Sequence, residues 1–353
     1  MKPPLPEVTA TEVLKLAIPA MIFAVLTHGY RVVDQYWSQG ISTEAQAAIG
    51  SSFFVLILMY ACWEIIAAGA GPLVARATGA GDAEERREII GNALSTTVAI
   101  TVLVMLVGGL GAEWLATIVG VHGETASEFS RYIRYLSLTI LPLALTPLVD
   151  HCFISMGDTK TPMALQAGSL AINIILTPLF IYNFNLGIVG AALASNTSRA
   201  ISTGLGLWIL LKRVRLRRKH LFDSSQILRI SRVGLPMALG TASYAGVYVL
   251  LLYFAISPLG PEINAALGIG FSALESISWP AFHGVALALA SIVGRAIGAG
   301  QSDKAWKVIH LTLPWFSTLG LAIALIFGLA GGWLTSWFTS DPIVHLAASE
   351  YAY

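Results

Sequence analysis

The chain contains nine apolar runs, each long enough to cross the hydrocarbon core of a membrane, which takes about 20 helical residues. Hydrophobic residues make up 56% of the 353 residues and charged residues only 12%, against roughly 25% in a soluble domain. So many apolar side chains cannot share one buried core, so they predict contact with lipid. The runs lie at about 14–37, 47–71, 89–112, 131–155, 163–184, 187–211, 233–255, 264–289 and 308–336, and a tenth candidate begins near Ile343.

Composition also limits the classes of function. The net charge of +1 gives no basic field for nucleic acid. Cys62 and Cys152 both lie inside apolar runs, which is typical of lone small hydrophobic side chains and not of a disulfide or metal framework. The sequence has no Walker loop, HExxH pattern or Cys/His/Asp cluster. We therefore expect no enzyme, no cofactor and no bound metal other than a coupling ion.

The Lys and Arg residues predict the orientation, because loops rich in them stay in the cytoplasm. With the N-terminus inside, 17 of the 21 Lys and Arg residues lie on the cytoplasmic side, and only Arg131 and Arg134 lie outside. The densest block, residues 212–220 (KRVRLRRKH), could be a nucleic-acid patch but is better explained as a cytoplasmic loop. The N-terminal segment lacks the pattern of a cleaved signal peptide. We expect a multi-pass protein of the inner or plasma membrane.

The chain repeats itself at an offset of 219 residues. Residues 71–82 (GPLVARATGAGD) match residues 290–301 (ASIVGRAIGAGQ) at six of twelve positions. The repeat predicts two parallel halves related by a pseudo-two-fold axis along the membrane normal, as in transporters that rock one half against the other. The expected parts are a six-helix bundle at 1–211, a basic cytoplasmic linker at 212–230 and a second bundle at 231–353.

The same offset places the end of a complete second half near about residue 430. About three and a half of its six helices are therefore expected in this chain. Either the sequence is a fragment or the second half is naturally incomplete.

Four stretches together resemble the multidrug and toxic compound extrusion (MATE) transporters, in order and spacing over essentially the whole chain. The stretches are Leu16–Pro19 with Val33-Asp34, Val74–Arg76 with Gly79–Gly81, Gly157–Met163, and residues 173–181 with residues 187–194. The resemblance implies an all-α polytopic membrane protein with two pseudo-symmetric six-helix bundles, the second incomplete here. It also implies export of organic substrates against H+ or Na+ influx. Tyr244 stands where the NorM-like branch places an acid, which favours the DinF-like branch.

An ionisable side chain inside a span is costly and normally faces a cavity or a partner, so each one is a functional candidate. Asp34 shares the first span with His28, Arg31, Gln35 and Ser38 at helical spacings, which predicts one polar stripe. Asp34 also matches the first-span acid of the family. Its predicted role is a carboxylate that binds H+ or Na+, and the alternative is a structural pair with Arg31.

The remainder of the predicted cation site departs from the family pattern, since the resemblance implies an acid where this chain has Thr177. We hypothesise that a second acid, on the fourth span, takes part instead. The predicted site then joins Asp34 to four residues on other spans: Asp150, Asn173, Thr177 and Ser195. The alternative is that Asp150 only orients His151 or the turn at Gly157-Asp158.

The substrate is expected between the two halves. Glu275 matches a family position that faces the central cleft, whereas Glu64 is either a cleft residue or a partner for Arg199. Embedded acids outnumber embedded arginines, and an unpaired carboxylate at low dielectric attracts a cation strongly. We therefore expect a small organic cation, with aromatic side chains adding cation–π surface. The predicted cleft residues are Glu64, Tyr244, Glu275 and Trp279.

Three functions are open at this point. The first is a cation-coupled exporter that works by alternating access, as a monomer in the lipid bilayer. The second is a flippase for lipid-linked oligosaccharide, which would need a cationic cleft for pyrophosphate and is disfavoured by the few embedded Lys and Arg residues. The third is a membrane scaffold or receptor that does not transport.

Overall fold

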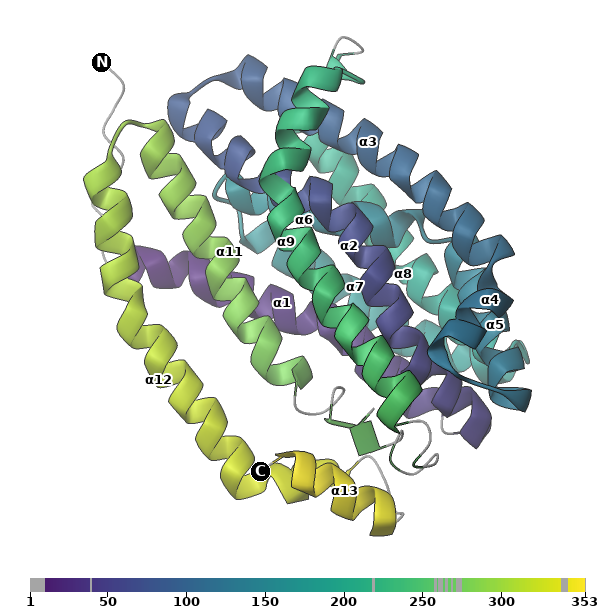
Figure 1. Ribbon diagram of the computed structural model, residues 1–353. Helices are drawn as coiled ribbons and strands as arrows, with labels where there is room; N and C mark the ends of the chain where they lie inside the picture. Colours follow the sequence, from purple (N-terminus) through teal and green to yellow (C-terminus); the bar gives the residue numbers. More distant parts are fainter. Residues whose placement is uncertain are drawn as a thin grey trace.

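The computed structural model describes residues 10–38, 40–217, 220–256, 275–337 and 342–352, together with positions 259, 263, 266, 267, 269 and 270. Every regular element in these ranges is helical (Figure 1). The first half holds α1 (Ala10–Ser38), α2 (Thr43–Ala80), α3 (Ala83–Leu110), α4 (Ala112–Val119), α5 (Gly123–Leu138), α6 (Leu141–Ser155), α7 (Lys160–Pro178), η1 (Leu179–Asn183) and α8 (Ile188–Val214). The second half holds α9 (Ser224–Leu251), η3 (Leu252–Ile256), α11 (Ser276–Gly298), α12 (Ser302–Thr335) and α13 (Pro342–Ala352).

Within the described residues, seven helices are long and apolar enough to cross a membrane, and α5 with α6 makes an eighth span if the pair is counted as one. This pattern confirms the predicted all-α polytopic membrane fold. The predicted span at 131–155 is not straight, because α5 and α6 meet at an angle of 57°. Pro142 at the start of α6 explains the break, since proline lacks the N–H that would continue the preceding helix.

The predicted span at 187–211 coincides with α8, which is not among the seven apolar helices. Its buried face is the reason, because it combines small apolar residues with many polar ones. The buried polar residues are Ser195, Asn196, Ser198, Arg199, Ser202 and Thr203. α8 therefore faces polar groups inside the bundle. The described part of the tenth candidate is α13, which has 11 residues.

The turn after α2 shows how the repeated motif acts locally. Gly81 ends α2 with a φ of 69°, a left-handed conformation that glycine adopts at little cost. Asp82 then starts α3, because its carboxylate accepts hydrogen bonds from the backbone N–H groups of Glu84 and Glu85 at 3.1 and 2.9 Å. Gly300, the counterpart of Gly81 in the repeat, has a φ of 76°. Both turns thus use a left-handed glycine, whereas Gln301, the counterpart of Asp82, makes no side-chain cap.

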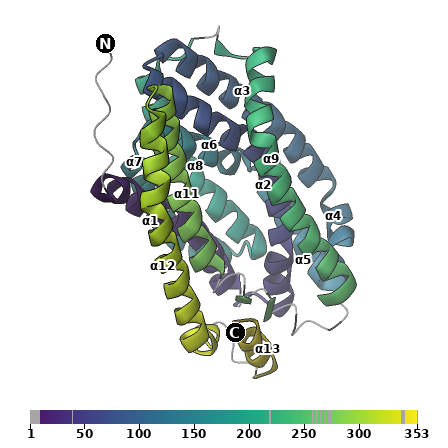
Figure 2. The ribbon, with the colours of Figure 1, turned by 60° about the vertical axis from the view of Figure 1, so that its left-hand side comes forward.

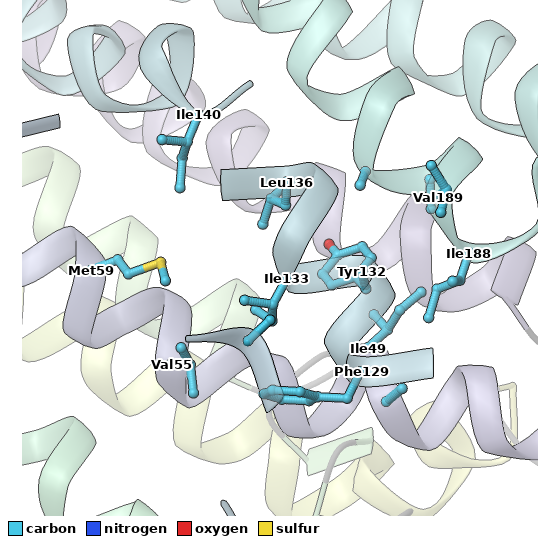
Figure 3. Packing of buried hydrophobic residues seen from close by; sticks show 14 of the residues in the cluster. Ile49, Val55, Met59, Phe129, Tyr132, Ile133, Leu136, Ile140, Ile188 and Val189 are labelled. Carbon is cyan, nitrogen blue, oxygen red and sulfur yellow. The ribbon is translucent and has the colours of Figure 1, made fainter. Parts of the chain in front are cut away.

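The main apolar core of the first half lies between α2, α5 and α8 (Figure 3). Phe129 and Ile133 of α5 are fully buried and pack with Val55 and Met59 of α2, while Ile188 comes from α8. Lipid tails are as apolar as these side chains, so close packing stabilises the cluster in the membrane more than removal from water does. This core fixes the positions of α5 and α8 around the polar site described below.

The turns that follow α2, α8 and α11 lie together at one end of the molecule (Figure 1). We refer to this end as the basic end, because the turns and the adjoining helix ends hold Arg86, Arg87, Lys212, Arg213 and Lys304. The predicted linker, 212–230, is helical at both ends, since α8 continues to Val214 and α9 begins at Ser224. Residues 218 and 219 of the basic block lie outside the described residues.

The linker is tied to α3. The backbone N–H of Asp223 donates to Asn92 Oδ1 at 2.6 Å, and Arg229 pairs with Glu85 at 2.8 Å. His220 Nε2 lies 3.1 Å from Glu84. The connection between the halves is therefore held against the first half.

The halves meet chiefly where α2 packs against α9, α1 against α11 and α2 against α11, and α6 also contacts α11. In both views α9 runs alongside α2, and α12 lies at the outer edge of the molecule (Figures 1 and 2). The most apolar stretch of α12 contains no buried residue. α1, like α2, packs against both halves, since it contacts α7 of its own half and α11 of the other half.

Candidate functional site

One face of α7 is polar and buried over its whole length. The side chains of Gln166, Ser169, Asn173 and Thr177 are at most 2% exposed, and their spacings of three and four residues place them on one stripe. Polar groups inside a membrane bundle require partners from neighbouring helices. α1, α6 and α8 provide these partners, at three levels along α7.

The first level contains Asp34, Asn173 and Ser195, which we call the Asp34 group. Ser195 Oγ of α8 donates to the Asp34 carboxylate of α1, at 2.9 Å from Oδ2 and 3.2 Å from Oδ1. Asn173 Nδ2 of α7 donates to Ser195 Oγ at 3.2 Å. Thr177 Oγ1 donates to the backbone carbonyl of Asn173 at 2.8 Å, one turn further along α7. The structure thus places three of the five predicted cation-site residues in direct contact and the fourth beside them.

Asp150, the fifth, lies at a different level. It is 3% exposed and accepts a hydrogen bond at 3.0 Å from Gln166 Nε2, two helical turns along α7 from Asn173. The alternative role of orienting His151 is not seen, because His151 Nδ1 bonds to the backbone carbonyl of Ala67 at 3.1 Å. Asp150 is therefore a separate buried acid near the Asp34 group and has its own amide partner.

Between these two levels lies Arg199 of α8. Its guanidinium carbon is 3.8 Å from the centre of the Tyr30 ring, and the residue is 8% exposed. The Tyr30 hydroxyl hydrogen-bonds to Ser169, whose own hydroxyl donates to the backbone carbonyl of Ser198 at 2.8 Å. Sequence reasoning missed this residue as part of the site and treated it as a partner for Glu64. The signal was its position one helical turn after Ser195.

Two carbonyl oxygens at the site are buried without a hydrogen-bond donor among the described residues, Asn173 Oδ1 and Gln166 Oε1. Each belongs to an amide whose NH2 group is already used. An amide oxygen beside a carboxylate provides hard oxygen ligands, which suit an alkali or alkaline-earth cation, and the carboxylate alone suits a proton. The described residues contain no group of three or more His, Cys, Asp or Glu side chains that could hold a metal ion.

The predicted pair of Asp34 with Arg31 is not formed among the described residues. Arg31 lies with its guanidinium carbon 3.3 Å above the ring of Phe53 of α2, and it interacts electrostatically with Glu275. His28 contacts Trp279 edge to face, with ring centres 5.5 Å apart. The polar stripe on α1 therefore divides, so that Asp34 faces α7 and α8 of its own half, whereas Arg31 lies between Phe53 of α2 and Glu275 of the other half. The side chains of Gln35 and Ser38 lie outside what the structure describes.

The acids predicted for the substrate cleft lie between the halves. The hydroxyls of Tyr244 and Tyr351 each donate to Glu275 at 2.8 Å, and we call these three residues the Glu275 group. Trp279 stacks on His283 with ring centres 4.6 Å apart and is 53% exposed. Glu64 accepts a hydrogen bond at 2.6 Å from Thr241 Oγ1 of α9, so its partner is Thr241 and not Arg199. A groove of about 220 Å³ between α1, α11 and α12 is apolar and contains none of these residues.

A family model described as MatE matches residues 19–179 and 236–353, which is most of the chain. The chain belongs to the MATE family. MATE proteins are membrane transporters and not enzymes, and the match covers both halves. The comparisons do not separate the branches of the family, so the DinF-like assignment stays a prediction.

Individual relatives agree with this membership. The chain is 24% identical over 343 residues to the FAD transporter of Shewanella oneidensis, covering 94% of this chain and 75% of the relative. It is 27% identical to the probable multidrug resistance protein NorM of Thermotoga maritima, covering 94% and 72%. A solved MOP superfamily transporter from Pyrococcus furiosus Vc1, described as having a reverse polarity of its binding pocket, has a TM-score of 0.86 at 23% identity, covering 96% and 76%. That last likeness shows the fold.

In this MATE transporter the repeated motif brings the two halves together at the basic end. A Cβ atom on Gly79 of α2 would collide with the backbone carbonyl of Arg295, and one on Gly298 of α11 would collide with that of Arg76. Arg76 and Arg295 are repeat counterparts, as are Gly79 and Gly298. The contact is therefore reciprocal, and each half contributes the same two positions. We call it the Gly79–Gly298 crossing.

Proposed function

We propose that this MATE transporter is a secondary active antiporter that exports small organic compounds, driven by influx of H+ or Na+ that binds at the Asp34 group. The observation that supports this most strongly is the burial of the Asp34 carboxylate, 6% exposed, where α1, α7 and α8 meet. A buried carboxylate without a cationic partner is costly, so a proton or sodium ion at this position is strongly favoured. Asn173 and Ser195 would hold a sodium ion together with Asp34.

α1 links this binding event to the rest of the molecule. Asp34 joins α1 to α7 and α8, while Ala17 and Ala20 of the same helix pack against Val285 and Ala288 of α11. Pro19 lies within the segment that packs against α11, between Ala17 and Ala20, and interrupts the backbone hydrogen bonds of α1, which favours bending there. Loading or emptying Asp34 changes how firmly α1 is held by its own half. The consequence is a change in its contact with the other half.

Alternating access further requires that one end of the pathway closes while the other opens. The Gly79–Gly298 crossing brings the backbones of α2 and α11 into contact at the basic end. Ser291 Oγ of α11 also donates to the backbone carbonyl of Ile154 of α6 at 2.6 Å, close to the same end. We propose that these contacts close the cytoplasmic side and separate when substrate enters.

The Glu275 group is the proposed substrate-binding region, with Tyr244, Trp279 and Glu64 nearby. Its carboxylate and aromatic rings favour a flat organic cation. Arg31 favours a second candidate class, because its guanidinium lies on Phe53 and interacts with Glu275. An aromatic anion such as FAD, after which the Shewanella relative is named an FAD transporter, would use Arg31.

The topology we propose has the basic end in the cytoplasm of the inner or plasma membrane, and we propose the same side for the N-terminus from the distribution of Lys and Arg in the sequence. Its support is the concentration of Lys and Arg in the turns at that end (Figure 1). We further propose that the protein acts as a monomer on small molecules without a nucleic-acid partner.

The test is transport by the purified full chain in liposomes. Ethidium is the cationic probe and FAD the anionic one, and either a Na+ or a pH gradient is imposed. We expect gradient-driven efflux of at least one probe and a loss of more than about tenfold in Asp34→Asn. Asp303→Asn, an exposed acid at the start of α12, is the matched control and should transport normally. Full gradient-driven efflux by Asp34→Asn would contradict the proposal.

A further inference from the structure

The partners of the polar face of α7 are arranged in order along the helix. Asn173 contacts Ser195 and, through it, Asp34. Ser169, one turn away, contacts Tyr30 and the backbone next to Arg199. Gln166, a further turn away, contacts Asp150. Because an α-helix rises 1.5 Å per residue, the seven residues from Gln166 to Asn173 separate the two acids by about 10 Å along α7, with Arg199 at the level between them.

Two pairs of residues one turn apart fix this middle level. On α1, Tyr30 precedes Asp34 by four residues, and on α8, Ser195 precedes Arg199 by four residues. The Ser195 hydroxyl meets Asp34, and the Arg199 guanidinium meets the Tyr30 ring. The ring is held in place by its hydroxyl, which bonds to Ser169. Arg199 therefore rests on an aromatic face, where a cation is favoured without an acid in contact.

Arg199 interacts electrostatically with both Asp34 and Asp150. Among the described residues, however, no ion pair of 4.0 Å or less joins the guanidinium to either carboxylate. Arginine stays charged in proteins, and a buried charge favours a paired position. Two buried carboxylates thus share one buried guanidinium, which leaves the cluster one positive charge short.

We propose that Arg199 is a tethered cation that exchanges between Asp34 and Asp150. When H+ or Na+ occupies Asp34, Arg199 pairs with Asp150. When the ion leaves, Arg199 moves to Asp34 and replaces it. Arg199 is in this sense a positioning residue, and Asp150 is its second counter-ion and not an ion ligand. The inference rests on the proposed role of Asp34.

The exchange accounts for release as well as binding, because departure of the ion does not leave Asp34 unpaired in the membrane. It also sets the stoichiometry at one monovalent cation for each cycle, since the cluster is short of one charge. The other titratable or charged groups around it are Tyr132 of α5 near Asp34, Tyr60 and Glu64 of α2 and Cys152 of α6 on the Asp150 side, and His28 of α1, which interacts with Arg199.

The experiment measures cation binding by the purified full chain as the shift in thermal unfolding with Na+ at fixed pH, and with H+ in the absence of Na+. Arg199→Gln should lower the half-saturating cation concentration at least about tenfold, because the internal competitor is gone, and should slow ethidium efflux. Asp150→Asn should raise that concentration at least about fivefold, because Arg199 then stays at Asp34. The double variant should return to within about threefold of the unmodified protein.

Two further variants serve as controls. Arg213→Gln removes an arginine that pairs with Asp158 outside the cluster and should leave the half-saturating concentration unchanged. Arg199→Lys keeps the charge and should stay within about threefold of the unmodified protein, which covers the case in which the Gln variant does not fold.

The proposal depends on the opposite directions in which the two single variants shift the half-saturating cation concentration. If both leave the cation response unchanged or shift it in the same direction, while Asp34→Asn abolishes it, the exchange is wrong and the function proposed for Asp34 stands. If Asp34→Asn keeps the cation response, the proposed function fails first. A purely structural Arg199 would weaken folding in both single variants without restoring binding in the double variant.

Discussion

Asp34 and Glu275 are both acids of the transporter interior, one in each half, and their surroundings differ. Asp34 is 6% exposed and is held by a serine that is itself held by an asparagine, all from helices of the first half. Glu275 accepts hydrogen bonds from two tyrosines of the second half and stands one turn from Trp279, which is 53% exposed. The first acid is enclosed on all sides by its own bundle, and the second lies where the halves meet.

The difference indicates a division of tasks. An enclosed carboxylate with small oxygen ligands has room for a proton or a bare ion but not for an organic molecule. A carboxylate surrounded by tyrosine hydroxyls and an exposed indole presents the flat, partly polar surface that an aromatic ligand requires. Coupling ion and substrate would then bind at separate places, connected by α1.

The largest effect is expected when the helices at the basic end are forced apart. The reason is that Asp34 and Glu275 are expected to open to the same side of the membrane. Gly298→Ala places a methyl group against the backbone of Arg76 and should separate α11 from α2. We expect coupled ethidium efflux in liposomes to fall more than about tenfold. Labelling by a membrane-impermeant thiol reagent from the cytoplasmic side should rise at Cys introduced near the crossing.

Gly246→Ala in α9 is the matched control, since a Cβ there meets no atom within 4 Å. Unchanged coupling in both variants would show that the crossing does not close the pathway.

The next largest effect tests whether Glu275 and Asp34 have separate roles. Glu275→Gln should raise the ethidium concentration at half-maximal efflux about tenfold, because the cation loses its counter-charge. The dependence on Na+ or H+ should stay as in the unmodified protein, in contrast to Asp34→Asn. Measuring both dependences in the same liposomes checks the division, which fails if Glu275→Gln also removes the cation dependence.

The smallest effect concerns the scaffold of the Asp34 group. Asp158, between α6 and α7, is partly buried, which disfavours its charge, but hydrogen bonds from Thr161 and the ion pair with Arg213 at 2.6 Å hold its pKa below the ordinary value of 3.8. A lowered pKa in the folded state contributes stability above about pH 4, and the contribution is lost as the pH falls through the folded-state pKa. Asp158→Asn should therefore reduce the free energy of unfolding by about 1 kcal/mol at pH 7, since Arg213 is half exposed.

The measurement is thermal unfolding of the two proteins in detergent at pH 7 and at pH 3. The difference between them should shrink at the lower pH. A constant difference would show that the carboxylate charge is not what stabilises this turn.

Much of the fold followed from the sequence, because hydrophobic length and the repeat are both strong signals. Two features did not follow. The break between α5 and α6 depends on Pro142, whose effect on a long apolar run is not visible in hydrophobicity alone. α8 was predicted as an ordinary span, although its polar residues are numerous enough to require a polar neighbour.

The site was predictable where residue type and spacing within one helix are sufficient. It was less predictable where the position of a side chain depends on the packing of three helices. The contact of Asp34 with Ser195 and Asn173 matches the expected grouping. Asp150 and Arg199 lie at two levels that depend on how α6 and α8 are shifted along α7. The spacing of residues within one helix does not determine this shift. Glu64 of the first half accepts a hydrogen bond from Thr241 of the second half. No sequence pattern within one half indicates this contact.

The Gly79–Gly298 crossing also constrains how the two halves can diverge. Each of the two glycines contacts the backbone of the counterpart helix in the other half. A larger residue at either position would therefore collide with the other half. After an internal duplication, this pair of positions would have to change together, whereas Asp34 and Glu275 have no such mutual contact and can specialise independently. The best-matched segment of the repeat is thus a place where the two copies contact each other directly.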